Sequence, residues 1–366
     1  MEAGDKVTIV TYPDEFDKDE IVGLAKAAGY KVEAVVTQRK LIKSEYGVGE
    51  GKAEELRELV SSNGSMKIII DASMTSAQAN KLSGMTHAEV VDRERLILNI
   101  FAQRANTSEA KLQVQLAELR YELPRAKDAV RNSVKGEQAG FSGMGEYAVD
   151  VQFRALRRRM VFVKEKLERA RTRREIHNSE RRKLDVPFVS LAGYTSSGKT
   201  TLFNRLTSES KEESPKLFTT LTTTTRLVRF PNSRRTVMLS DTVGFISRLP
   251  TYLVESFKST LDELRYADLV LLLVDASEGM ENIRIKLESC KETLSDLEVD
   301  PRKILLVLNK VDLITDRAPA RVDDDPLFKG FSTARISATR GDGMRKLSNR
   351  ILEMTQDSAH VGHRRV

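Results

Sequence analysis

Apolar runs alternate with segments of helical periodicity in the first quarter of the chain and again in its second half. Near the N-terminus, strands are predicted at 7–12, 32–36, 66–70 and 88–91, with helices at 20–28, 52–62 and 76–82 between them. In the second half, strands are predicted at 188–192, 236–240, 268–276, 303–309 and 334–337. Because strands that alternate with helices form parallel sheets, we predict a small parallel α/β domain over 1–91, a doubly wound α/β domain over 185–357 and a polar tail over 358–366.

The middle of the chain, residues 92–184, has the pattern of two long helices. Leu112, Leu116, Leu119 and Leu123 are spaced by four, three and four, and the same seam recurs from Phe153 to Ala170. Pro124 is predicted to close the first helix, and the glycine-rich stretch 134–147 to connect it to the second. We therefore predict an antiparallel hairpin whose arms are each about 45 to 50 Å long at about 1.5 Å per residue.

Composition restricts the compartment. The chain has 366 residues, which favours more than one domain. Its single Cys290 excludes a disulfide framework and a four-thiolate metal site, and together with four scattered histidines it favours a reducing compartment. The longest apolar run, 269–274, is too short to cross a membrane, and the N-terminus does not resemble a signal peptide. We expect a cytoplasmic protein with no membrane association, and a monomer.

Positive charge is concentrated in the predicted hairpin. Residues 92–183 contain 22 Lys and Arg against 13 Asp and Glu, a net charge of +9, whereas the whole chain carries +7. The bases that we select as candidate RNA contacts are Arg154, Arg157, Arg158, Arg159, Lys164, Arg169 and Arg173. Too few acids lie nearby to pair them, and aromatic residues are scarce, so the pattern favours folded RNA recognised through its backbone and shape.

A phosphate-binding loop lies between a predicted strand and a predicted helix. Its residues are Gly193, Tyr194, Thr195, Ser196, Ser197, Gly198, Lys199, Thr200 and Thr201. Loops with this Gly-four residues-Gly-Lys-Thr spacing turn backbone N–H groups toward phosphates. Lys199 is predicted to contact the β- and γ-phosphates, and Thr200 to ligate Mg²⁺.

Two further motifs follow in the order of a Mg²⁺-dependent nucleotide hydrolase. In the threonine-rich stretch 219–225, Thr220 can offer its hydroxyl to Mg²⁺ and its amide to the γ-phosphate. Asp241 ends an apolar strand and can reach Mg²⁺ through water, while Gly244 lets its N–H approach the γ-phosphate. Lys199, Thr220 and Gly244 are therefore the candidate catalytic residues.

The motif Asn309-Lys310-Val311-Asp312 selects the base. The Asp312 carboxylate can accept hydrogen bonds from guanine N1–H and the 2-amino group, whereas adenine would leave that charge unpaired. Sites of this kind reject an analogue that lacks the donors by about 10⁴- to 10⁵-fold. Ser337, Ala338 and Thr339 then place a backbone amide near guanine O6. The five motifs together predict a GTPase that binds GTP and GDP with Mg²⁺.

The chain resembles the HflX family of translation-factor-related GTPases nearly end to end. The resemblance rests on GVGEGK at 47–52, DRERLILNIFAQRA at 92–105, KLQVQLAEL at 111–119, LPR at 123–125, GMGE at 143–146 and DTVGFISRLP at 241–250. It implies an N-terminal α/β domain with a helical hairpin, a Ras-like P-loop G domain and binding to the large ribosomal subunit, with splitting or rescue of stalled ribosomes in some members. Two residues depart from the family pattern. Ser196 replaces an asparagine that would support a bound potassium ion, and Tyr147 replaces a threonine.

Phe245 occupies the position where Ras-like GTPases carry the glutamine that orients the attacking water. A phenyl ring cannot bond that water, so we expect slow intrinsic hydrolysis, near the roughly 10⁻⁴ s⁻¹ of an unassisted small GTPase. Either a partner supplies the missing group, or Phe245 turns away and another group of the chain holds the water. Restraint by the N-terminal domain is a further explanation for slow turnover.

Other functions stay open at this stage. The protein could be a non-ribosomal GTPase switch that binds a protein effector, or an RNA-binding protein whose GTP site is mainly structural. The stretch 47–52 could cradle an anion for an ATP-driven activity, but it lacks the first glycine and the following Ser or Thr of a phosphate loop. We interpret it as a turn before a helix.

Overall fold

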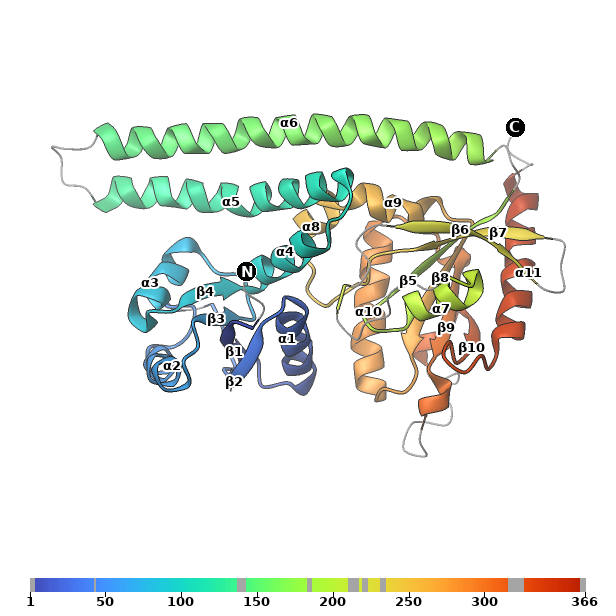
Figure 1. Ribbon diagram of the computed structural model, residues 1–366, viewed down its shortest axis with the longest axis horizontal. Helices are drawn as coiled ribbons and strands as arrows, with labels where there is room; N and C mark the ends of the chain where they lie inside the picture. Colours follow the sequence, from blue (N-terminus) through green and yellow to red (C-terminus); the bar gives the residue numbers. More distant parts are fainter. Residues whose placement is uncertain are drawn as a thin grey trace. The chain divides into compact units, whose positions relative to one another are not determined.

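The computed structural model describes residues 4–42, 44–136, 143–182, 186–209, 217–218, 223–230, 235–314 and 326–362. Contacts divide the chain into two compact units, residues 1–170 and 171–366. Each unit contains one sheet with helices packed around it (Figure 1). Within the described ranges, no helix is both long and apolar enough to cross a lipid bilayer.

The first unit begins with the small parallel sheet that the sequence predicts. Its strands are β1 (Lys6–Thr11), β2 (Lys31–Thr37), β3 (Lys67–Ile70) and β4 (Glu89–Asp92), in the order β2-β1-β3-β4, and all pairs are parallel. Helices α1 (Glu15–Ala27), α2 (Glu50–Asn63) and α3 (Ser76–Thr86) connect the strands. Since every connection returns the chain to the same end, the residues that follow the strands gather at one carboxyl edge.

The predicted antiparallel hairpin is confirmed. After α4 (Arg93–Arg104), helices α5 (Ser108–Gly136) and α6 (Gly143–Arg182) lie side by side (Figure 1). The buried seam between them contains Leu116, Leu119 and Val163, with Leu112, Leu156, Met160 and Leu167 packed against it. The predicted arm length was wrong for the second arm, because α6 has 40 residues and is about 60 Å long. The connection is also shorter than predicted, since Gly143 and Gly145 already belong to α6.

Pro124 does not close the first arm, as the sequence pattern predicts, but lies inside α5. A proline removes one intrahelical hydrogen bond, and contacts of the flanking residues offset that loss. Tyr121 Oη donates to Asp92 Oδ1 at 3.1 Å, and Arg125 donates to the same carboxylate and to Met74 O at 2.7 Å. The helix therefore continues because both sides of Pro124 are held on the end of β4.

The second unit is a six-stranded sheet of order β10-β9-β8-β5-β7-β6. Its strands are β5 (Phe188–Gly193), β6 (Thr224–Arg229), β7 (Thr236–Asp241), β8 (Leu269–Asp275), β9 (Ile304–Asn309) and β10 (Ser332–Arg335). Five of these strands are predicted by the sequence. The edge strand β6 is not, and it runs antiparallel to β7.

Helices cover both faces of this second sheet. They are α7 (Lys199–Thr207), α8 (Thr251–Ser256), α9 (Lys258–Tyr266), α10 (Met280–Asp296) and α11 (Met344–Gly362), with short 3₁₀ turns at Pro301–Lys303, Val311–Leu313 and Pro326–Phe328. Leu202 and Phe203 of α7 and Leu347 of α11 share one core with alternate residues of the strands, while α9 contacts β5 and α10 contacts β8. Helix α11 continues past the predicted end of the domain at 357, and residues 363–366 of the predicted tail lie outside the described ranges.

Candidate guanine-nucleotide site

The phosphate loop connects the carboxyl end of β5 to the first turn of α7. Gly198 has φ +92°, and a Cβ there would collide with Asn309 Nδ2, so this position requires glycine. Ser196 also has positive φ, and Ser197 N donates to Tyr194 O at 3.3 Å. These residues form a tight loop that leads directly into the N-terminus of α7. The N-terminus of a helix favours the binding of phosphate.

Lys199 is buried at the base of this loop. Its ammonium donates to Gly193 O at 3.0 Å and to Tyr194 O at 2.8 Å. Burial lowers the pKa of Lys199 to about 8, although Asp241 opposes that effect. A bound phosphate would supply the negative charge that this cation lacks. The predicted role of Lys199 is therefore consistent with its position and its electrostatics.

Thr200 and Asp241 come together at the N-terminus of α7. The Thr200 hydroxyl lies 3.4 Å from Asp241 Oδ2, and Asp241 is fully buried at the end of β7. A hydroxyl and a carboxylate oxygen beside a phosphate loop are ligands that Mg²⁺ accepts. Among the described residues, no group of three or more His, Cys, Asp or Glu gathers to hold a metal ion. An ion at this place would need further ligands, which phosphate, water and the predicted Thr220 hydroxyl could supply.

The segment after β7 lies along the phosphate loop. Phe245 N donates to Gly193 O at 3.1 Å, and Thr195 N donates to Phe245 O at 2.8 Å. A Cβ at Gly244 would come within 3.0 Å of Lys199 Nζ. The Phe245 side chain is 1% exposed. Its ring is therefore part of the core, which agrees with the alternative that Phe245 turns away from the attacking water.

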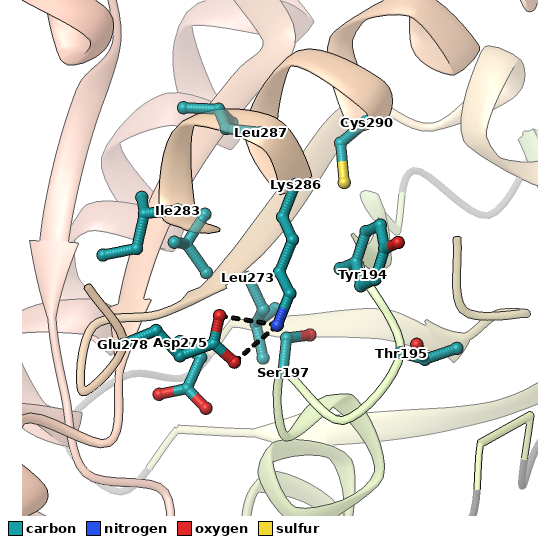
Figure 2. A pocket seen from close by; sticks show the side chains of 11 residues that line it. Tyr194, Thr195, Ser197, Leu273, Asp275, Glu278, Ile283, Lys286, Leu287 and Cys290 are labelled. Carbon is teal, nitrogen blue, oxygen red and sulfur yellow. Dashed lines mark hydrogen bonds and ion pairs between the residues drawn. The ribbon is translucent and has the colours of Figure 1, made fainter. Parts of the chain in front are cut away.

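Tyr194 makes a contact that its place in the loop did not predict. Its phenol oxygen accepts from Ser247 N at 2.6 Å, and Lys286 of α10 lies 5.3 Å from its ring centroid while it is ion-paired with Glu278. These side chains line a cavity behind the loop (Figure 2). The cavity holds about 10 Å³, far too little for a nucleotide. Burial there raises the pKa of the Cys290 thiol to about 12, so it stays neutral.

Asn309 connects the phosphate loop to the loop that follows β10. Its Nδ2 donates to Ser197 O at 2.9 Å, and its Oδ1 accepts from Ala338 N at 3.0 Å. Asn309 is 1% exposed, and both bonds are buried. The predicted asparagine of the base motif therefore holds two nucleotide-binding segments in register.

The remaining base-motif residues lie beside Asn309. Lys310 is ion-paired with Asp275 at the end of β8, a partner that sequence reasoning did not identify. A hydrogen bond from Ser337 holds the pKa of the Asp312 carboxyl below its ordinary value, and Arg340, 3.5 Å away, acts in the same direction. Asp312 is thus an ionised acceptor, as reading guanine N1–H and the 2-amino group requires.

The structure brings most of the predicted site residues to one edge of the second sheet. The phosphate loop begins at the end of β5, Asp241 ends β7 and Gly244 follows it, Asn309 ends β9 and leads to Asp312, and Ser337 to Thr339 follow β10. The carboxyl ends of parallel strands are where α/β folds bind ligands. Thr219 and Thr220 lie outside the described residues. The predicted RNA-contact residues lie on α6, away from these strand ends in sequence.

Three family models match the chain in succession. Residues 15–102 match GTP-binding GTPase N-terminal, residues 104–181 match GTP-binding GTPase Middle Region, and residues 188–310 match 50S ribosome-binding GTPase. Together they span most of both units. The first two cover the α/β sheet and the hairpin, and the third covers the phosphate loop, the metal motifs and the start of the base motif.

Curated relatives and solved structures agree with these matches. The chain is 42% identical to GTPase HflX of Thermococcus kodakarensis over 83% of this chain and 68% of the relative. It is 38% identical to GTPase HflX of Escherichia coli over 96% of this chain and 83% of the relative. A GTP-binding protein from Sulfolobus solfataricus, solved with GDP, is 25% identical with a TM-score of 0.51, covering 96% of this chain and 99% of that one.

The nucleotide motifs, their convergence at one sheet edge and the end-to-end relatives lead to the same assignment. Lys199, Asp241 and Asp312, the predicted phosphate-binding cation, metal ligand and base acceptor, all lie at this edge. The chain belongs to the HflX family of GTPases, and it binds guanine nucleotide and hydrolyses GTP.

Proposed function

We propose that this GTPase acts with Mg²⁺ on the large ribosomal subunit, in the splitting or rescue of ribosomes. The observation that carries the proposal is a basic helix face in the first unit, combined with a GTP site in the second. Such a protein works in the cytoplasm, and it is expected to bind as a monomer. The name of the third matched family, 50S ribosome-binding GTPase, supports the same partner.

The basic face lies on α6. Six of the seven predicted RNA contacts, Arg154, Arg157, Arg158, Arg159, Lys164 and Arg169, are exposed; the side chain of Arg173 lies outside the described residues. Arg154, Arg157 and Arg158 line a broad hollow together with Val161. Clustered guanidinium groups bind phosphates through paired N–H donors and release counterions as they do so. This face is therefore suited to the backbone of folded RNA.

Arg159 approaches the other arm of the hairpin. It lies close enough to Glu118 of α5 to lower that carboxyl's pKa, although burial dominates and leaves the pKa raised. A test of RNA binding therefore uses Arg154, Arg157 and Arg158, because these three residues line the hollow together.

Mg²⁺ would be held by Thr200 and Asp241, and by Thr220 as the sequence predicts. The ion would neutralise charge that builds up between the β- and γ-phosphates. Lys199 binds and orients those same phosphates. The backbone N–H of Gly244 could approach those phosphates, because this residue has no side chain to occupy the space next to Thr195 and Lys199.

The decisive experiment measures GTP hydrolysis with the large subunit, with the small subunit and with neither. The large subunit should raise kcat at least about tenfold, since the phenyl ring of Phe245 cannot orient water and, in this proposal, the subunit completes the catalytic site. Equal rates in all three reactions would contradict the ribosomal part of the proposal. A protein effector would then be the better candidate partner.

A charge reversal tests which face binds. The triple variant Arg154→Glu, Arg157→Glu and Arg158→Glu should no longer bind the large subunit, while GDP affinity stays unchanged. The log–log salt slope should fall by roughly one unit for each phosphate that the variant no longer neutralises. The matched control reverses Lys6, Lys31 and Arg57, which are exposed bases on the α/β part of the same unit. If the control weakens binding as much as the test variant does, net charge and not the α6 face is responsible.

A further inference from the structure

Arg205 holds the loop that reads the base. It lies in the last turn of α7, and its guanidinium donates to three successive carbonyls, Ala338 O at 3.1 Å, Thr339 O at 2.7 Å and Arg340 O at 3.0 Å. Hydrogen bonds from a charged donor are stronger than those between neutral groups. One side chain thus orients three consecutive peptide groups of loop 337–341.

The loop is shaped to receive this guanidinium. Gly341 has φ +98°, and a Cβ there would collide with Arg205 Nη2. Any other residue would therefore both strain the backbone and displace Arg205. The requirement for glycine at position 341 does not depend on the hydrogen bonds, and it also indicates that Arg205 packs closely against loop 337–341.

The orientation of these peptides decides which N–H faces a ligand. The chain has no cis peptide among its described residues, so each N–H points opposite to the preceding carbonyl. Arg340 N donates to Ser337 Oγ at 3.0 Å, and Gly341 N donates to Ser337 O at 2.7 Å. Ala338 N is bound to Asn309. In the described part of the chain, Thr339 N–H has no such acceptor, and it points away from the Ala338 carbonyl that Arg205 holds.

We propose that Arg205 is a positioning residue for guanine recognition, and that it aims the Thr339 N–H at the 6-oxo group of the base. The helix that begins with Lys199 of the phosphate loop thus carries, in its last turn, the residue that orients loop 337–341. Arg205 thus supplements Asn309, which connects the same two loops from the interior. This inference concerns nucleotide specificity and does not depend on the ribosomal partner.

The test compares GDP with 6-thio-GDP in the full-length protein. The thio analogue keeps N1–H and the 2-amino group for Asp312 but replaces O6 by sulfur, a weak hydrogen-bond acceptor. Arg205→Met should weaken GDP binding about tenfold, the effect of removing one hydrogen bond, and should weaken 6-thio-GDP binding less than about threefold. The control Arg302→Met, at an exposed arginine of another loop, should change neither affinity.

Equal losses of affinity for the two nucleotides, or no loss for either, would overturn the proposal. Arg205→Lys separates geometry from charge, because lysine keeps the cation but not the planar fork of donors. A partial recovery of GDP affinity in Arg205→Lys is the expected result. Full recovery would show that charge alone acts on the loop, which contradicts positioning by three bonds.

Discussion

The carboxyl ends of the parallel strands carry charged residues in both sheets, but in the N-terminal sheet these charged residues bind one another. At the end of β3, Asp71 accepts from Thr11 at 2.6 Å and from Arg93 at 2.7 Å, and Arg93 is also ion-paired with Glu20. All four residues are buried. At the end of β4, Asp92 accepts from the amides of Met74 and Arg95. This edge is filled by the chain itself.

The edge of the second sheet differs at Lys199. Lys310 and Asp312 have partners of opposite charge there, Asp275 and Arg340. Lys199 is buried without a carboxylate at hydrogen-bond distance, and its ammonium bonds only to carbonyls of its own loop among the described residues. A buried cation of this kind is costly unless a ligand supplies the opposite charge. The carboxyl ends of parallel strands can therefore be closed with ion pairs, or can keep one buried cation for the phosphates of a nucleotide.

A substitution of Asp312, the predicted base acceptor, should have the largest effect on nucleotide affinity. Asp312→Asn should lower GDP affinity by about 10³- to 10⁵-fold and favour xanthosine diphosphate, because an amide donates where the carboxylate accepted. Isothermal titration with both nucleotides measures the switch. Asp300→Asn, at an aspartate of another loop, is the control. Unchanged guanine preference in Asp312→Asn would contradict the base assignment.

Breaking the N-terminal edge should affect folding and leave nucleotide binding intact. Arg93→Met leaves Asp71 and Glu20 buried without their cation, which should destabilise the first unit by about 3 to 5 kcal/mol. Because the chain has no tryptophan, hydrogen exchange of β1 and β3 amides is the suitable measurement.

Two further variants complete the Arg93 experiment. Arg57→Met, at an exposed salt bridge, should change exchange little. Replacing Arg93, Asp71 and Glu20 together by apolar residues should recover most of the lost protection. Protection that survives Arg93→Met alone would show that this ion cluster does not hold the sheet.

A smaller effect is expected from the lowered pKa of Lys199, which should make the free energy of unfolding depend on pH. Its folded value of about 8 lies below the ordinary 10.5, so between these pH values the unfolded chain binds the extra proton. The nucleotide-free protein should therefore gain up to about 3 kcal/mol of unfolding free energy as pH rises from about 8 to 10.5. Lys199→Met should abolish that gain, and Lys258→Met, at an exposed lysine, should not.

The protonation of Lys199 should also be measurable through nucleotide binding. Phosphates favour the ammonium, so GDP binding at about pH 9 should take up a proton, and affinity should fall as pH rises above about 8. Calorimetry in buffers of different ionisation enthalpy measures the uptake. An affinity that is flat between about pH 7 and 10 would mean that Lys199 is already fully charged in the free protein.

The nucleotide edge could be predicted because its chemistry lies in short local motifs. The spacing from Gly193 to Thr200 and the run Asn309 to Asp312 each follow an apolar strand, so topology alone brings them together. Strand β6 could not be found in this way. As an edge strand it buries only Val228, and no apolar run marks it.

Contacts between distant segments were beyond sequence reasoning. Glu20, Asp71 and Arg93 form one cluster from three separate elements, and no spacing rule connects them. Arg205 reaches Thr339 of loop 337–341 across 134 positions of sequence. The prediction for Pro124 was wrong for the same reason, because what holds α5 together there is Asp92 of a different element.

The pairing of Phe245 with the phosphate loop has a mechanical consequence. Its two backbone hydrogen bonds form one parallel bridge with Tyr194, at the centre of the loop. The segment after β7 is thus tied to the loop through the backbone and not only through side chains. Any displacement of Phe245 along the chain has to break these two bonds or move Gly193 and Thr195 with it.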